Sequence, residues 1–128
     1  MIPIERWSDG MKIIYEYTIG LGRRLLDKDV EIRFVNCEKF GGGKQWAACY
    51  GRGHRPIGHL DYNVFVLGRR WFEQGATEAV DNLILHEFGH DFESNHLCAE
   101  YHEALTRLGA KLKSVALREP DWFLRFQL

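Results

Sequence analysis

Cysteine and proline are scarce in this chain of 128 residues, which has 3 of each. Small secreted domains rely on denser, even-numbered sets of cysteines, so we interpret Cys37, Cys49 and Cys98 as small core residues. The longest run of large aliphatic and aromatic residues is Val64–Leu67, whereas a membrane-spanning helix needs about 20 apolar residues. The sequence therefore argues against a disulfide-stabilised secreted domain and against a membrane span.

A surplus of charge of one sign is lacking as well. The 17 Lys and Arg residues nearly balance the 18 Asp and Glu residues, which gives a net charge of −1 at pH 7. This balance argues against a strongly basic nucleic-acid-binding module, but it leaves room for a local basic patch with weak contact to DNA. The residues that would form this patch, unless they are ordinary solvated side chains, are Arg52, His54, Arg55, Arg69 and Arg70.

The chain has the length and composition of one globular domain. An apolar content of 45% supports a core, and 128 residues leave no room for a second core of ordinary size. We therefore expect a single domain over residues 1–128. Charged residues lie near the N-terminus, where a signal peptide needs an apolar stretch, so we expect a cytoplasmic protein.

The spacing of apolar residues predicts a helix followed by three strands. Residues 4–26 carry apolar side chains three and four positions apart, as on one face of a helix. From Val30 to Phe34 the period changes to two, which is typical of a half-buried strand. Two further short strands are predicted at Trp46–Tyr50 and Ile57–Val64. Their hairpin-like connections indicate a three-stranded, mostly antiparallel sheet arranged as a meander.

Two helices are predicted after the strands. Thr77 is the expected N-cap of a helix that runs to about His90. The pair Ser94–Asn95 is expected to form a turn and to cap the next helix, which carries Leu97 on its apolar stripe and is limited by Pro120. The aromatic residues of the tail are expected to fold back onto the core: Trp122, Phe123 and Phe126. A run of strands followed by helices predicts an α+β fold.

The first of these two helices ends in a sequence that predicts a metal site. Residues 86–90 read His-Glu-Phe-Gly-His, which is an HExxH motif. Four residues correspond to about 400° of helix rotation, so His86 and His90 lie one turn apart on the same face and can reach one ion. Glu87 lies beside them, where its carboxylate can accept a proton from a water at the metal. The motif therefore predicts metal-assisted hydrolysis with Glu87 as the general base.

A catalytic zinc site needs a third protein ligand and keeps its fourth position open. His96 follows His86 by ten residues, and we expect it to complete a HExxHxxxxxH site for one Zn²⁺ per chain. Cys98 is a rival ligand, although thiolates usually belong to closed structural sites. Glu100 and Glu103 are the remaining alternatives.

These motifs resemble those of known zinc peptidases. The histidine spacing is similar to that of metzincins, HExxHxxGxxH, but Glu93 stands at the glycine position and no methionine follows the motif. The chain more closely resembles the small HExxH metallopeptidases of the SprT-like, WLM and YgjP-like group. This resemblance covers about residues 30–117, with residues 95–109 as the third-ligand segment and residues 47–50 and 57–63 as the preceding sheet. It implies a minimal zincin-like fold and a zinc-dependent peptidase, some of whose relatives cleave proteins attached to DNA.

Other functions remain open from the sequence. The same fold could use zinc only for stability, as a catalytically idle binding or regulatory module. The intact Glu87 favours an enzyme, because a structural zinc site does not need this carboxylate. A third variant, on the pattern of ImmA/IrrE-like peptidases, would make Glu103 the third ligand in place of His96. In an enzyme, a protein or peptide substrate is expected to add to the edge strand of the sheet.

Several other residues are candidates for supporting roles. Carboxylates near the ligands in sequence could orient an imidazole: Asp91, Glu93, Glu100 and Glu103. Tyrosines could stabilise an oxyanion, and the sequence does not choose among them: Tyr50, Tyr62 and Tyr101. His54 and His59 are either ordinary loop histidines or contacts to metal or substrate, and His102 is expected to be exposed.

Overall fold

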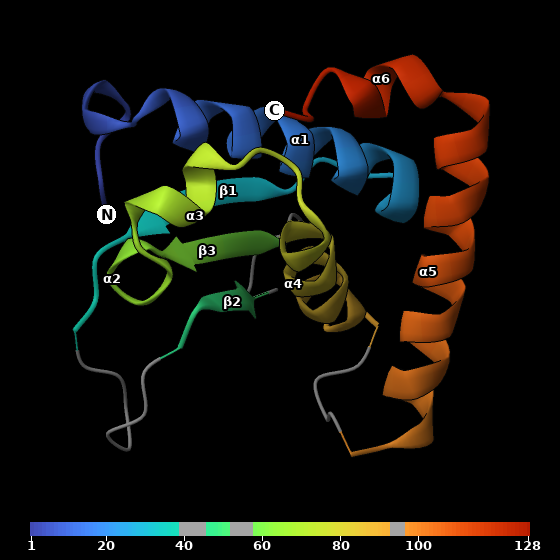
Figure 1. The fold of residues 1–128 in the computed structure, drawn as a ribbon. Helices are drawn as coiled ribbons and strands as arrows, with labels where there is room; N and C mark the ends of the chain where they lie inside the picture. The colour runs from blue at the N-terminus through green and yellow to red at the C-terminus, as the bar shows by residue number, and fades with distance from the viewer. Residues whose placement is uncertain (39–45, 52–57, 93–96) are drawn as a thin grey trace.

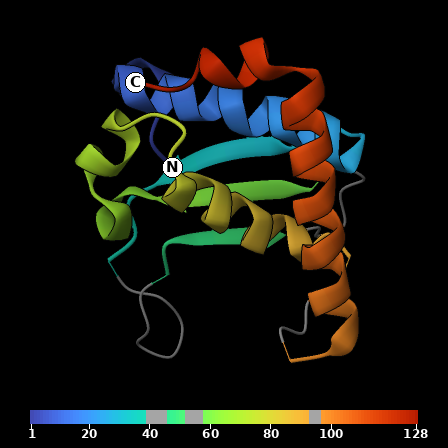
Figure 2. The same cartoon turned by 45° about the vertical axis from the view of Figure 1, so that its right-hand side comes forward.

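The computed structural model describes residues 1–38, 46–51, 58–92 and 97–128. Within these ranges the chain is an α+β fold in which helices pack against a three-stranded mixed sheet (Figure 1 and Figure 2). The elements follow in this order: η1 (Ile4–Arg6), α1 (Asp9–Leu26), β1 (Glu31–Val35), β2 (Ala48–Gly51), β3 (His59–Asn63), α2 (Val64–Leu67), α3 (Arg69–Glu73), α4 (Glu78–Gly89), α5 (Ala99–Arg118) and α6 (Pro120–Leu124).

The sheet is not the expected antiparallel meander. Its strand order is β1-β3-β2, so β3 lies in the centre, parallel to β1 and antiparallel to β2. Leu60 and Tyr62 of β3 are fully buried, whereas every residue of β2 is half-buried, as an edge strand allows. Alternating hydrophobicity predicts that a segment is a strand, but it carries no information on the direction of its neighbours. The predictions of three strands and of an antiparallel pairing between the second and third are confirmed, whereas the predicted meander order and the antiparallel direction of β1 are wrong.

The two faces of the sheet differ in polarity. Phe34 and Tyr62 point into the core, where α1 lies beside β1 and α4 beside β2 (Figure 1). The opposite face carries Arg33 and Asp61, which form a two-pronged ion pair with N–O distances of 2.7 and 2.9 Å. The HExxH helix is therefore packed on the apolar face and next to the edge strand.

Helix α1 begins later than the sequence predicts. Residues 4–6 form a separate 3₁₀ turn, and α1 begins at Asp9, after Ser8. The Ser8 hydroxyl accepts a hydrogen bond from the Met11 N–H at 3.2 Å, which satisfies one of the amides that a helix start leaves unpaired. The predicted N-cap of α4 is confirmed, because the Thr77 hydroxyl accepts a bond from the Val80 N–H at 3.3 Å.

Helix α5 also begins later than predicted. Its N-cap is Cys98, and the expected capping pair Ser94–Asn95 lies outside the described residues. Leu97 precedes the helix and is 91% exposed, so the prediction that it belongs to the buried stripe is wrong. The C-terminal limit is confirmed, because α5 ends at Arg118 and Pro120 occupies the first turn of α6, where its missing N–H costs nothing.

Two short helices, α2 and α3, are missing from the sequence prediction. The run Val64–Leu67 turns into α2 directly after β3, where the Asn63 side chain accepts a hydrogen bond from the Phe65 N–H at 3.2 Å. Gly68, with φ of +76°, then separates α2 from α3. Helices of four and five residues are too short to show a helical period, which is why the apolar pattern did not reveal them.

The C-terminal tail folds back onto α1, as predicted. The Trp122 ring lies over Gly20, where a Cβ atom would be 2.1 Å from the nearest ring carbon. The guanidinium carbon of Arg24 lies 3.7 Å from the Trp122 ring centroid, and Tyr17 stacks on the same ring at 5.6 Å. Phe126 is 4% exposed, so the tail contributes to the core.

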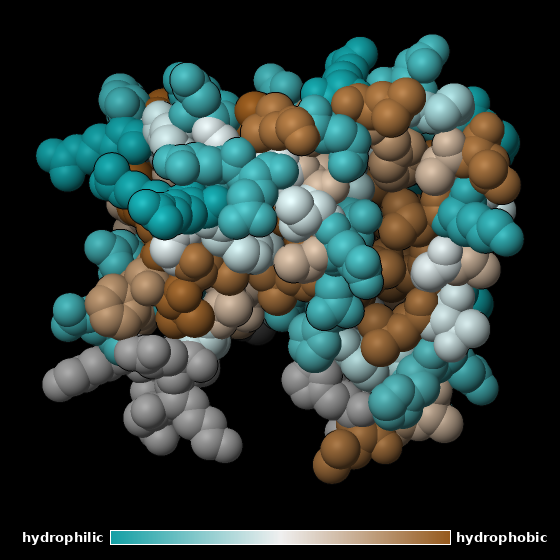
Figure 3. Space-filling model, in the orientation of Figure 1, coloured by the Kyte–Doolittle hydropathy of each residue, from teal (hydrophilic) through white to brown (hydrophobic). Residues whose placement is uncertain are grey.

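The surface is uneven in hydropathy. The space-filling view shows mostly hydrophilic side chains over α1 and α3, and apolar side chains where α4 and α5 diverge (Figure 3). In the part of the chain that the structure describes, no helix is both long enough and apolar enough to cross a membrane.

Candidate metal and catalytic site

Helix α4 presents the two histidines of the motif side by side. The ring centroids of His86 and His90 are 5.5 Å apart, and the rings are inclined at 85°. The His86 side chain is 46% exposed, and His90 is half-buried. The i, i+4 spacing in an uninterrupted helix produces this arrangement, as the sequence predicts. Two neighbouring imidazoles with access to solvent can bind one metal ion together.

Glu87 is buried beside these imidazoles. Its oxygen Oε1 lies 3.9 Å from His86 Nε2, and its side chain is only 7% exposed. Burial raises the pKa of Glu87 to about 7, although a hydrogen bond from the backbone of Tyr50 acts in the opposite direction. A carboxyl group with a pKa near neutrality can both accept and return a proton at physiological pH, which suits general acid–base chemistry.

Helix α5 contacts the motif through Tyr101. The Tyr101 hydroxyl donates a hydrogen bond to the carbonyl oxygen of His86 at 2.8 Å. Its ring centroid lies 5.1 Å from that of His90 and 5.9 Å from that of His86. Gly89 makes this approach possible, because a Cβ atom there would lie 2.7 Å from the Tyr101 ring. One of the two variable positions of the motif is therefore fixed as glycine by helix packing.

The three tyrosines considered for an oxyanion role all have hydroxyl groups engaged with the protein. Tyr101 donates to the His86 carbonyl, and Tyr50 donates to Asp91 Oδ1 at 2.7 Å. Tyr62 is fully buried, with its hydroxyl 2.7 Å from that of Thr18. The Thr18 proton goes to the Ile14 carbonyl, so Tyr62 is the donor in that pair. All three tyrosine hydroxyl groups therefore donate their protons to hydrogen bonds within the protein.

Asp91, directly after the motif, is held from two sides. Its Oδ1 accepts hydrogen bonds from Lys28 Nζ at 2.5 Å and from the Tyr50 hydroxyl at 2.7 Å. Asp91 is 8% exposed. Two other carboxylates considered for orienting an imidazole, Glu100 and Glu103, are exposed on α5. The third, Glu93, lies outside the described residues.

His96, the expected third metal ligand, lies outside the described residues. Within residues 1–38, 46–51, 58–92 and 97–128, no three His, Cys, Asp or Glu side chains form a group that could hold a metal ion. The rivals Cys98, Glu100 and Glu103 therefore do not join His86 and His90 in this structure. His96 remains a prediction.

The remaining described candidates belong to other elements than the motif. His59 belongs to the polar face of the sheet, where its Nδ1 lies 3.0 Å from Arg33 Nη2. His102 is exposed on α5, as predicted. Arg69 and Arg70 are exposed at the start of α3. The other members of the predicted basic patch lie outside the described residues: Arg52, His54 and Arg55.

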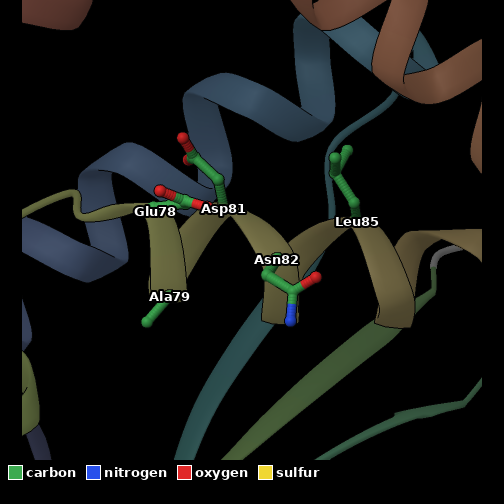
Figure 4. Close-up of a pocket in the computed structure, with 5 residues that line it drawn as sticks. All are labelled: Glu78, Ala79, Asp81, Asn82 and Leu85. Atoms are coloured by element: carbon green, nitrogen blue, oxygen red, sulfur yellow. The ribbon is translucent and has the colours of Figure 1, made fainter.

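A hollow along α4, between the helix start and the motif, was not predicted from the sequence. It has a volume of about 630 Å³ and is lined by residues of this one helix: Glu78, Ala79, Asp81, Asn82 and Leu85 (Figure 4). Asp81 accepts a hydrogen bond from the buried Tyr17 hydroxyl, and burial raises the pKa of Asp81. The acidic end of the hollow is therefore part of the joint between α1 and α4.

Comparisons with known proteins found no match to this chain. No protein-family model matches the chain, and neither the curated proteins nor the solved structures that were searched include a match. A function for this chain has to be inferred from its own residues.

Proposed function

We propose that this chain is a zinc-dependent metallopeptidase with a minimal zincin-like fold. His86, His90 and His96 would hold one Zn²⁺, and Glu87 would be the general base. The observation that carries the proposal is the buried Glu87 carboxyl, which has a pKa near 7 and lies beside two imidazoles that are 5.5 Å apart. A helix end built only for stability has no use for a buried carboxylate at that position.

The chain's own residues would carry the proton transfers. Bound zinc would supply a Lewis acid for the substrate carbonyl and would acidify a water. The Glu87 carboxylate would accept the proton of that water and return it to the leaving amine. Tyr101 would keep the His86 turn of α4 in place, since its hydroxyl bonds the backbone of that residue.

The substrate would be a protein or peptide that adds to strand β2. The Asn63 N–H donates to the Ala47 carbonyl at 2.8 Å, which marks these residues as a hydrogen-bonded pair of the antiparallel ladder. Because such pairs alternate, the backbone N–H and carbonyl of Ala48 and the carbonyl of Tyr50 face away from β3 and would pair with the peptide, while the Tyr50 N–H bonds Glu87. An extended peptide paired with this edge would run past α4, which lies beside β2.

The enzyme would act in the cytoplasm and would make at most weak contact with DNA. The exposed Arg69 and Arg70 would supply part of that contact. Such an electrostatic contribution would weaken steeply with added salt.

Turnover by the zinc-loaded protein tests this function. The wild type should hydrolyse an unfolded protein substrate, and Glu87→Gln should keep the bound zinc and lose at least about 100-fold in kcat. Glu16→Gln, an exposed carboxylate on α1, is the matched control and should retain full activity. A zinc-loaded wild type that cleaves nothing across a broad panel of peptides and proteins would favour an idle, zinc-stabilised binding module.

A further inference from the structure

Tyr50, in the edge strand β2, contacts the HExxH segment at two positions along the chain. The backbone of Tyr50 makes a hydrogen bond to the Glu87 carboxyl group. The Tyr50 hydroxyl donates to Asp91 Oδ1 at 2.7 Å, beyond the last turn of α4. Between these contacts the Tyr50 ring lies edge-on to Phe88, with centroids 6.4 Å apart at 73°. Tyr50 thus touches residues on both sides of His90.

The register of the sheet makes the Tyr50 N–H available for this contact. Tyr50 lies opposite Leu60, three positions along β2 from the hydrogen-bonded pair of Ala47 and Asn63. Hydrogen-bonded and non-hydrogen-bonded pairs alternate in an antiparallel ladder, so Tyr50 belongs to the second kind. Its N–H therefore points away from β3 and is not used within the sheet. A slip of β2 by one residue would turn this N–H into the ladder.

The Tyr50 phenol is held by residues from three segments that are far apart in the sequence. Lys28, in the turn after α1, places its Nζ 2.5 Å from the same Asp91 oxygen. Asp91 itself is only 8% exposed, so the surrounding protein restricts the movement of its carboxylate. Gly58 leaves the space that the hydroxyl needs, because a Cβ atom there would lie 2.1 Å from the Tyr50 oxygen.

We propose that Tyr50 is a positioning residue, whose phenol, anchored on Asp91, fixes β2 along α4 and thereby directs the Tyr50 N–H at the Glu87 carboxylate. The consequence for catalysis rests on the proposed function of Glu87 as general base. A general base must lie within hydrogen-bond reach of the proton it accepts, and a displacement of about 1 Å can cost about 100-fold in rate. Tyr50 would act on the reaction only through Glu87.

Hydrogen exchange tests the positioning without any assumption about activity. In Tyr50→Phe the backbone N–H remains but the anchor on Asp91 is lost, so the residue 50 amide should exchange at least about tenfold faster in the full chain. The amide of Phe34, in β1, should keep its wild-type rate. Tyr15→Phe is the control, because this half-buried tyrosine lies on α1 against Trp7. Unchanged exchange at residue 50 in Tyr50→Phe would overturn the proposal.

Kinetics then test the consequence for Glu87. Tyr50→Phe should lower kcat about tenfold or more, with KM and zinc content unchanged. In a Glu87→Gln background the same change should alter residual turnover less than about twofold, because there is no base left to position. An equal loss in both backgrounds would show a general structural effect and overturn the positioning role. If the zinc-loaded wild type is inactive, the proposed function fails, while the exchange experiment still decides whether Tyr50 holds Glu87.

Discussion

Gly89 lies so close to Tyr101 that a Cβ atom on the glycine would be 2.7 Å from Cε2 of the tyrosine ring. The same tyrosine donates a hydrogen bond to the carbonyl oxygen of His86, one turn earlier in α4. The HExxH helix and α5 therefore meet at the motif itself. A substitution that alters the contact between Gly89 and Tyr101 is therefore expected to shift both His86 and His90.

Gly89→Ala should destabilise the protein because the added methyl group overlaps the Tyr101 ring. We expect a loss of about 1–3 kcal/mol in the free energy of unfolding, measured by urea titration, together with weaker zinc binding. Gly109→Ala is the matched control, since nothing lies within 4 Å of a Cβ atom at that position of α5. The control should gain about 0.5–1 kcal/mol, because alanine favours a helix over glycine. Equal effects at the two positions would contradict the close approach at Gly89.

Asn63→Asp should weaken the sheet next to the site. The fully buried Asn63 side chain accepts the N–H of Cys37 and donates to the carbonyls of Cys37 and Trp46, at 2.9–3.1 Å. Aspartate has no amide protons to donate, and it would place a carboxylate against two carbonyl oxygens. We expect a loss of about 3 kcal/mol in unfolding free energy. Asn36→Asp, at an exposed neighbouring position, should change stability by less than about 0.5 kcal/mol.

In the metal-free protein, Glu87 should make stability fall as pH rises. Its pKa in the fold is about 7, above the ordinary value of 4.5, so between these values the folded chain keeps a proton that the unfolded chain has lost. The stabilising effect of the protonated carboxyl is complete below pH 4.5 and is lost as pH rises through 7. At about 1.4 kcal/mol per pH unit, the upper bound of this loss is about 3 kcal/mol.

Chelator-treated wild type and Glu87→Gln, compared by urea unfolding, check this sign. The variant has no proton to lose at this position, so its advantage over wild type should grow from pH 5 to pH 8. A difference that stays constant over that range would mean that the Glu87 carboxyl is not buried in solution.

Removal of zinc should lower the melting temperature. A metal that binds only the folded chain stabilises it by about 4 kcal/mol at a free concentration 1,000 times the Kd, and a chelator removes that contribution. His96→Ala should lose most of the zinc, as measured by metal analysis, and should melt like the chelated wild type. His102→Ala, an exposed histidine on α5, should keep both zinc and melting temperature. Full zinc content in His96→Ala would require another third ligand.

The parts of this protein that follow from its sequence are those with short-range causes. Helix α4 follows from apolar spacing and from the Thr77 cap, and its backbone hydrogen bonds join residues four positions apart. The juxtaposition of His86 and His90 follows from the same period. Pro120 ends α5 for an equally local reason, since its ring cannot continue a helix.

Tertiary structure decided what depends on partners far away in the chain. The central place of β3 is set by pairing with β1 and β2, which apolar alternation within one strand does not encode. Burial in the folded chain raises the pKa of Glu87 to about 7, and this burial is a product of tertiary packing. Tyr50 meets Asp91, 41 positions later, only because the sheet and α4 are packed together. The sequence alone determined which side chains share a helix face, and the packing of separate segments decided their burial, their hydrogen-bond partners and their protonation.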